Sequence, residues 1–423
     1  MVSRPAPPFY NTTFDLSVMA SGLLEKSLGF IRKQQNAFKV NMAKNVVQNF
    51  SLGLTQQYQS IYITALGATA MELGYVASAG GLAFALVTLP VGWLADRYGI
   101  RKVLLAALLL MACGYSVFGF ATGWQVTAVA FMLTSVAFET TMNVCPMICG
   151  SSLVSAERVT GMQLCDTVAS LPRLFAPVVA AYLITGFGGL TADGIRPLYW
   201  FEVTGLAVAF LIILRFFRDP RRSGGPERVS LGVGLRRVFG EGVKVRRWIV
   251  YTMLTMFPNY MALYVPLYAR QVKGAGQLTL GLMDMGYWLI IVLLAIPVGL
   301  VADRFGRKRL IGLMAPLYSV GIMLLMVAPN EATLVVAGLL TGFIMLSSVT
   351  GGSISVELVP KELLGSWFGI IGLFRSLVSV ASPLLAGLLW NSLGPASVLI
   401  FLAVTQVVKL GILATMPNAI QRD

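Results

Sequence analysis

Long apolar segments separated by short polar turns recur along the whole chain of 423 residues. Each segment has about 20 residues, the length of α-helix needed to cross a hydrocarbon core about 30 Å thick. The segments lie near residues 45–67, 73–95, 102–121, 124–149, 159–186, 196–217, 248–270, 278–301, 309–327, 332–356, 363–389 and 395–416. This pattern predicts an all-α integral membrane protein with twelve transmembrane helices.

The longest hydrophilic stretches divide these helices into two groups of six. We predict a cytoplasmic N-terminal segment at 1–44, a six-helix bundle at 45–217, a basic cytoplasmic linker at 218–247 and a second six-helix bundle at 248–423. Within the first segment, apolar residues from Leu16 to Ile31 share one helical face and predict an interfacial helix.

Composition excludes an ordinary soluble protein. Hydrophobic residues make up 57% of the chain and charged residues 12%, against about 45–50% and about 25% in soluble domains. The formal net charge is +14. In a soluble protein this charge would suggest nucleic acid as a partner. Here the basic residues lie at the ends of apolar segments and in the linker, so we expect them to contact anionic membrane lipids and not nucleic acid.

The distribution of lysine and arginine predicts the orientation. Loops on one side of a twelve-helix model carry most of these residues, including the whole linker. The opposite loops carry little beyond Arg196, Arg270 and Lys273. Because cytoplasmic loops are enriched in lysine and arginine, we expect a multi-pass protein of the cell membrane with both termini in the cytoplasm.

One charged string occurs twice, at equivalent places in the two halves. GWLADRYGIRK runs from Gly92 to Lys102 and GLVADRFGRKR from Gly299 to Arg309, and Pro-Val precedes each copy. A charged turn repeated at half the chain length indicates two halves of similar design.

A twelve-helix protein with this string after its second and eighth helices resembles the major facilitator superfamily of secondary transporters. The resemblance implies two pseudo-symmetric six-helix bundles, a solute site between them at the membrane midplane, and alternating access. It also implies that helices 1, 4, 7 and 10 line the cavity, with 2, 5, 8 and 11 beside it. The sequence has no Gly-x4-Gly-Lys-Ser/Thr string for nucleotide binding, so we expect a proton or solute gradient to supply the energy.

The repeated string is a candidate gate. Its glycines permit close helix approach and a tight turn, its aspartates can accept hydrogen bonds from a helix N-terminus, and its basic residues can reach lipid headgroups. We expect a breakable latch between the halves; an alternative is that these residues anchor the topology. The candidate gating residues are Gly92, Asp96, Arg97, Gly99, Arg101, Gly299, Asp303, Arg304, Gly306 and Arg307, with Asp284 in helix 8 and Glu357 in the turn after helix 10.

Charged residues inside predicted helices are the next candidates, because charge within a membrane is costly. Arg173 and Arg375 occupy similar depths in the fifth helix of each half. Two guanidinium groups near the midplane would suit an organic anion. The alternative is that each arginine pairs with a carboxylate on a neighbouring helix, for example Arg173 with Glu139 or Asp284. Glu202 in helix 6 and Lys409 in helix 12 are charged as well.

Proton coupling would have to use a carboxylate. The sequence contains no histidine, the side chain that titrates unaided near neutral pH. A buried carboxylate can replace it, and we place Glu139 first and Asp166 second as proton carriers.

Polar residues gather in the first helix of each half. Amide and phenol groups at midplane depth can hydrogen-bond a polar solute, although interhelical packing is a common use of the same residues. With the arginines, the expected substrate-binding residues are Gln56, Gln57, Gln59, Asn143, Arg173, Asn259, Tyr260 and Arg375.

Three alternatives to an anion transporter remain open at this point. Ala176-Pro177 and Ser382-Pro383 begin degraded forms of a string found in drug/proton antiporters, which keeps multidrug efflux as an alternative. A transporter-like solute receptor would have the same helices. A membrane enzyme acting on lipid should show clustered metal ligands or histidines, which the sequence does not offer.

The four cysteines complete the list of chemically active residues. Cys113, Cys145, Cys149 and Cys165 lie within predicted helices without Cys-x-x-Cys spacing or histidine partners. We interpret them as small hydrophobic residues. We therefore expect no metal site. We also expect no cofactor and no enzymatic activity. The expected state is a monomer whose partners are a small-molecule solute, protons and lipid.

Overall fold

The computed structural model describes residues 29, 32–88, 94, 97–153, 158–219, 243–348 and 364–416. These residues form twelve helical spans in two halves, which confirms the predicted fold class. Within these ranges, ten helices are long and apolar enough to cross a membrane. The helices of spans 1 and 7 are not among these ten.

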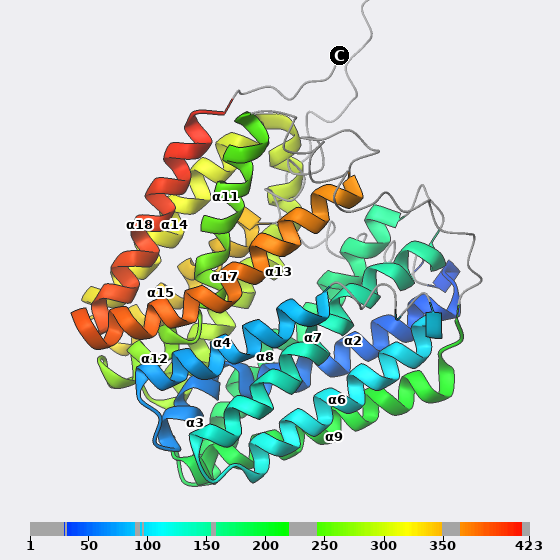
Figure 1. Ribbon diagram of the computed structural model, residues 1–423, viewed down its shortest axis with the longest axis horizontal. Helices are drawn as coiled ribbons and strands as arrows, with labels where there is room; N and C mark the ends of the chain where they lie inside the picture. Colours follow the sequence, from blue (N-terminus) through cyan, green and yellow to red (C-terminus); the bar gives the residue numbers. More distant parts are fainter. Residues whose placement is uncertain are drawn as a thin grey trace, which may run out of the picture.

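The first half contains six spans (Figure 1). In chain order they are α2 (Asn36–Thr55) with η1 (Gln56–Tyr58) and α3 (Gln59–Ala65), α4 (Ala70–Thr88), α6 (Ile100–Phe120), α7 (Trp124–Ser152), α8 (Arg158–Gly186) and α9 (Ala192–Phe216).

The second half repeats this order. Its spans are α11 (Val243–Tyr260) with α12 (Tyr264–Gln271), α13 (Gln277–Phe305), α14 (Arg307–Val327), α15 (Glu331–Thr341) with its continuation to residue 348, α17 (Leu364–Leu393) and α18 (Pro395–Ala414).

The first span of each half is broken at an equivalent place. In the first half, three residues of 3-10 helix separate α2 from α3. In the second half, residues 261–263 form a turn between α11 and α12, and Pro258 just before it lacks an amide hydrogen to continue the helix. A broken helix leaves backbone groups free inside the membrane, which is tolerated where it is buried in protein or lines a cavity.

Span 1 begins at Asn36, whereas the apolar pattern places its start near residue 45. The difference arises because its first turns carry Asn41, Lys44 and Asn45, which lower the hydropathy although all three are buried by neighbouring helices. Most of the predicted interfacial helix and most of the linker lie outside the described residues.

Two glycines of the repeated string make the turns between neighbouring helices. Gly99 precedes α6 with φ of 91°, and Gly306 precedes α14 with φ of 92°. Only glycine adopts this region without strain, which explains why the string needs glycine there. We call the end of the molecule that carries these turns the motif end, and the opposite end the distal end.

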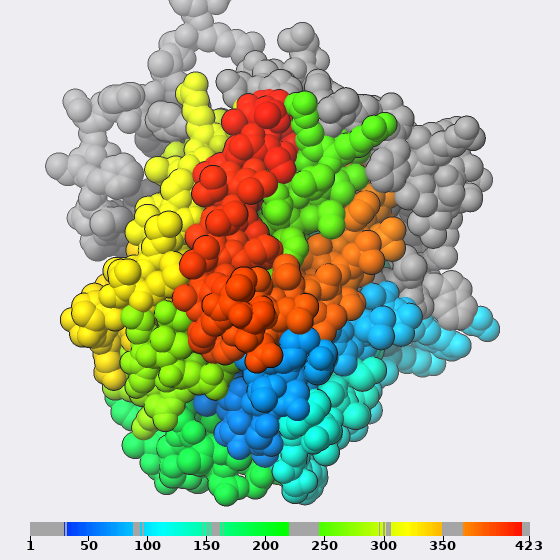
Figure 2. Space-filling view, turned by 60° about the vertical axis from the view of Figure 1, so that its left-hand side comes forward, coloured from blue at the N-terminus to red at the C-terminus, as the bar shows by residue number. Residues whose placement is uncertain are grey.

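The halves meet through two equivalent helix pairs. The α4 helix packs along α17, and α8 packs along α13, so the second helix of each half contacts the fifth helix of the other (Figure 1). Figure 2 shows the helices of the two halves as separate groups in contact along this boundary.

Candidate functional site

An ion pair joins the two halves. Arg375 on α17 donates from Nη2 to both carboxylate oxygens of Glu139 on α7, at 2.9 Å and 2.8 Å. The Glu139 side chain is 4% exposed and that of Arg375 is 38% exposed. Asn143, one turn along α7, donates to Glu139 Oε1 at 2.9 Å and fixes the orientation of the carboxylate.

Residues of both halves surround the Arg375 guanidinium. Its Cζ lies 4.8 Å from the ring centroid of Phe84 on α4, a distance at which cation–π attraction contributes. Tyr260, at the end of α11, is also within reach of Arg375 and Glu139. The first half therefore supplies both a carboxylate and an aromatic ring to an arginine of the second half.

Arg173 occupies the corresponding place on α8 but has a different environment. Its Cζ lies 4.6 Å from the ring centroid of Trp288 on α13, in the other half. Its Nε, like that of Arg375, is buried without a hydrogen-bond partner, but among the described residues Arg173 forms no ion pair. Asp284, one turn before Trp288, is within electrostatic range but beyond ion-pair distance.

We call Arg173, Arg375, Glu139, Phe84 and Trp288 the arginine layer. Each arginine lies on the fifth helix of its own half and reaches an aromatic ring on the second helix of the other. Within the described part of the chain, one guanidinium is paired with a carboxylate and the other is not. The layer can therefore accept an anion without first breaking an ion pair.

Two tyrosines close the distal side of this layer in equivalent ways. Tyr58 Oη lies 3.0 Å from the Pro177 carbonyl of its own half and 2.9 Å from the Gln277 carbonyl of the other. Tyr264 Oη lies 3.2 Å from the Pro383 carbonyl of its own half and 2.8 Å from the Ala70 carbonyl of the other. Each hydroxyl has one hydrogen, which it donates to one of its two carbonyls at a time. Donation to either carbonyl holds the tyrosine at the boundary between the halves.

Glycines allow the halves to approach at these tyrosines. A Cβ on Gly281 would lie 2.7 Å from the Pro177 carbonyl oxygen, and one on Gly74 would lie 2.7 Å from the Pro383 carbonyl oxygen. These distances are shorter than van der Waals contact, so no other residue fits without a shift. We call Tyr58, Pro177 and Gly281, together with Tyr264, Pro383 and Gly74, the distal closure.

Further hydrogen bonds between the halves lie near the distal closure. Gln57 donates to the Leu280 carbonyl at 3.1 Å, Ser78 donates to the Val380 carbonyl at 2.7 Å, and Gln277 donates to Thr185 Oγ1 at 2.9 Å. In this conformation the distal side of the arginine layer is tightly packed.

The basic residues of the repeated string bind within their own halves. Arg101 donates from Nη2 to the Leu214 carbonyl at 2.5 Å, and its backbone N–H donates to Asp219 at 2.8 Å. Lys308, at the same position of the second copy, donates to the Ala414 and Met416 carbonyls. Each cation thus caps the C-terminus of the last helix of its half, where the helix dipole is negative.

Other gating candidates are described in part. Arg97 is exposed and its Cζ lies 5.7 Å from the Tyr98 ring, and Arg307 is half-buried. Gly299 lies within α13. The side chains of Asp303 and Arg304, and the residues Gly92, Asp96 and Glu357, lie outside the described residues.

The structure separates Asp166 from the arginine layer. Asp166 is exposed on α8 and lies near the thiols of Cys145 and Cys149. Of the predicted polar lining, Gln56 is exposed, and Gln59 and Asn259 are half-buried.

Two aromatic residues of the site are not indicated by the sequence pattern. Phe84 and Trp288 lie in apolar helices, where core packing explains such residues equally well. The charged residue Glu202, by contrast, stands out in the sequence, because a glutamate in an apolar helix is costly. It is fully buried on α9 and accepts a hydrogen bond from Thr55 at 2.5 Å, while its other oxygen has no partner among the described residues.

Comparison with known proteins places the chain among transporters. The sequence model of the Major Facilitator Superfamily matches residues 46–283 and 274–414. The probable galactarate/D-glucarate transporter GudP of Escherichia coli K12 is 21% identical over 371 residues, covering 78% of this chain and 81% of GudP.

Two solved structures show the same fold. The nucleoside transporter NupG is similar with a TM-score of 0.72 and 14% identity, covering 90% of this chain and 98% of NupG. The xylose transporter XylE of E. coli, in an inward open conformation, has a TM-score of 0.69 and 15% identity, covering 93% of this chain and 97% of XylE.

Proposed function

The chain belongs to the major facilitator superfamily of membrane transporters, and from this premise we propose that it moves a small organic anion coupled to a proton gradient. Family membership makes it a multi-pass membrane protein that carries a small-molecule solute, and it removes the lipid-enzyme alternative. The substrate class and the coupling are the proposed parts.

The observation that carries the proposal is the guanidinium of Arg173, which has no ion-pair partner in the described chain, beside the paired guanidinium of Arg375. A half-buried guanidinium without an ion-pair partner is partly desolvated at a cost, and a carboxylate substrate would supply the missing negative charge. A carboxylate accepts two parallel N–H bonds from a guanidinium. The name of the relative GudP refers to two dicarboxylates, galactarate and D-glucarate, which is the same substrate chemistry.

Proton coupling follows from the second arginine. While Glu139 is ionised, it pairs with Arg375 across the halves. A proton on Glu139 would remove the charge that neutralises Arg375, and the released guanidinium could bind a second carboxylate of the substrate. Proton and anion would then bind together, as symport requires.

The sidedness of the cycle follows from the lysines and arginines. The motif end carries these residues in excess, so we assign it to the cytoplasm together with both termini, in the cell membrane. The distal closure then shuts the outer side. Rupture of the distal closure would open the arginine layer outward, in the manner of alternating access.

Flux in proteoliposomes tests this proposal. We expect uptake of labelled galactarate driven by a pH gradient, with loss of uptake in Arg173→Ala and Arg375→Ala. Arg246→Ala is a matched control, because Arg246 is exposed near the start of α11. Expulsion of lipophilic cations without galactarate uptake would assign drug/proton antiport instead. Binding without flux would assign a receptor.

A further inference from the structure

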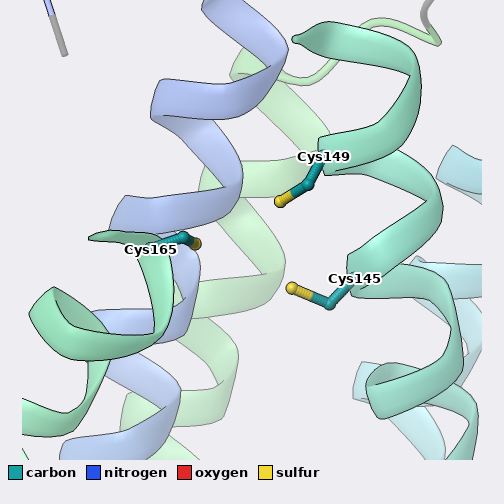
Figure 3. Close-up of side chains that lie close together, drawn as sticks. All are labelled: Cys145, Cys149 and Cys165. Carbon is teal, nitrogen blue, oxygen red and sulfur yellow. The ribbon is translucent and has the colours of Figure 1, made fainter. Parts of the chain in front are cut away.

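Three cysteines from two helices meet inside the first half. Cys145 and Cys149 are one turn apart on α7, and Cys165 lies on α8. Their sulfur atoms all lie within 4.8 Å of one another, and all three point into the same space beside α2 (Figure 3). Residue spacing does not indicate this cluster, because the third cysteine lies on a different helix.

Two amides of α2 donate to this cluster. Asn41 Nδ2 lies 3.2 Å from Cys145 Sγ and 4.0 Å from Cys149 Sγ. Asn45 Nδ2 lies 3.3 Å from Cys145 Sγ and 3.6 Å from Cys165 Sγ. Every sulfur therefore receives an N–H group. Donors of this kind stabilise thiolate ligands and orient them.

A buried cation accompanies the thiols. Lys44 is 0% exposed, and its Nζ donates to Gln48 Oε1 at 2.9 Å. Within the described part of the chain it forms no ion pair with a carboxylate, and all three thiols are within its electrostatic range. A buried ammonium needs a negative counterpart, which thiolates would provide.

A buried oxygen also lacks a partner here. Asn41 is 0% exposed, and its Oδ1 forms no hydrogen bond with the described residues. Rotation of the amide about its terminal bond exchanges oxygen and nitrogen. The rotated amide would present Oδ1 to the cluster as a fourth metal ligand in place of its N–H contacts, while Asn45 would still donate to Cys145 and Cys165.

We propose that Cys145, Cys149 and Cys165 bind one thiophilic divalent cation of the Zn²⁺ class. Zinc binds thiolate sulfur at about 2.3 Å, so three sulfurs around one ion lie about 4 Å apart, close to the spacing here. Three thiolates and a divalent ion leave one negative charge, which the Lys44 ammonium balances. Such an ion would join spans 4 and 5, and span 1 through Asn41, near the motif end and six residues along α7 from Glu139.

Spectroscopic titration with Co²⁺ and Cd²⁺ tests the site. The full chain is purified in detergent, reduced and stripped of metal. We expect thiolate-to-metal charge-transfer bands that saturate at one ion per chain and are lost in Cys145→Ser and in Cys165→Ser. Cys113→Ser is the matched control, because Cys113 is exposed and outside the cluster. This variant should give the same charge-transfer bands as the unmodified chain. Absence of these bands from the unmodified chain overturns the proposal.

Thiol labelling gives a second readout that does not depend on the serine variants folding. Zn²⁺ should slow the reaction of Cys145, the partly exposed thiol of the cluster, with a maleimide and leave the reaction of Cys113 unchanged. Lys44→Gln should weaken binding by about ten- to a hundred-fold, as loss of a partner around metal ligands does. Equal labelling with and without Zn²⁺, or loss of two thiols to a disulfide with no metal binding, overturns the proposal.

Discussion

Glu139 and Arg375 are 236 residues apart in the sequence, yet their carboxylate and guanidinium groups are 2.8 Å apart at the boundary between the two halves. The pair joins the fourth helix of one half to the fifth helix of the other. A transporter that separates its halves during each cycle has to break this pair or carry it through the movement. This makes Glu139 a better candidate than Asp166 for the proton carrier.

We expect Glu139→Gln to abolish uptake driven by a pH gradient while exchange of labelled for unlabelled substrate continues. The amide cannot carry a proton but can still accept a hydrogen bond from Arg375. Counterflow and gradient-driven uptake in the same proteoliposomes separate the two activities. Asp166→Asn is the comparison, and it should leave both unchanged. Gradient-driven uptake by Glu139→Gln with an unaltered pH profile would exclude Glu139 from coupling.

Removal of the arginine from this pair should also destabilise the protein. Arg375→Ala leaves a carboxylate that is 4% exposed without its partner. Breaking a fully buried pair costs about 3–5 kcal/mol, and we expect less here because Arg375 keeps partial contact with solvent. The double variant Glu139→Gln with Arg375→Ala should recover part of the loss in thermal unfolding. Equal instability of the single and double variants would show that the pair itself contributes little.

Arg173 should determine affinity for an anionic substrate. Arg173→Lys retains the charge but loses the planar contact with Trp288 and the two-pronged hydrogen bonding. We therefore expect Kd for galactarate to rise in Arg173→Lys and binding to be lost in Arg173→Ala, measured by thermal shift or calorimetry. An unchanged Kd in Arg173→Ala would place the substrate elsewhere.

A methyl group at the distal closure should push the halves apart. In Gly74→Ala and Gly281→Ala the new Cβ meets a proline carbonyl at 2.7 Å, and overpacking of this kind costs about 1–3 kcal/mol. We expect slower cross-linking by a short bis-maleimide between cysteines placed at Thr185 and Gln277. Gly312→Ala is the control, because nothing lies within 4 Å of its Cβ. Unchanged cross-linking would show that the closure tolerates the methyl group.

The basic residues of the repeated string should act first on stability. Arg101 and Lys308 cap the last helix of their own halves, and such contacts contribute about 0.3–1 kcal/mol each. We expect Arg101→Ala and Lys308→Ala to lower the unfolding temperature while transport per folded molecule is unchanged. A changed transport rate at unaltered stability would instead support a latch between the halves.

Hydrophobic periodicity predicted all twelve spans because crossing a membrane requires a fixed length of apolar helix. The hydrophobic pattern was weakest in spans 1 and 7, the two spans whose helices are broken. Spans 1 and 7 fall outside the ten apolar helices because they carry polar residues and are broken near Tyr58 and Tyr264. The start of span 1 was placed too late for the same reason, since Lys44 is polar in the sequence and buried in the fold.

By itself, the sequence determined the number of helices, the duplication of the halves and the presence of charged residues within the membrane, because each of these depends on local composition or on a repeated string. The tertiary structure decided which side chains contact one another. Arg375 rather than Arg173 pairs with Glu139, and Cys165 joins Cys145 and Cys149. Such pairings depend on how whole helices pack and rotate against one another, which residue spacing within a single helix does not specify.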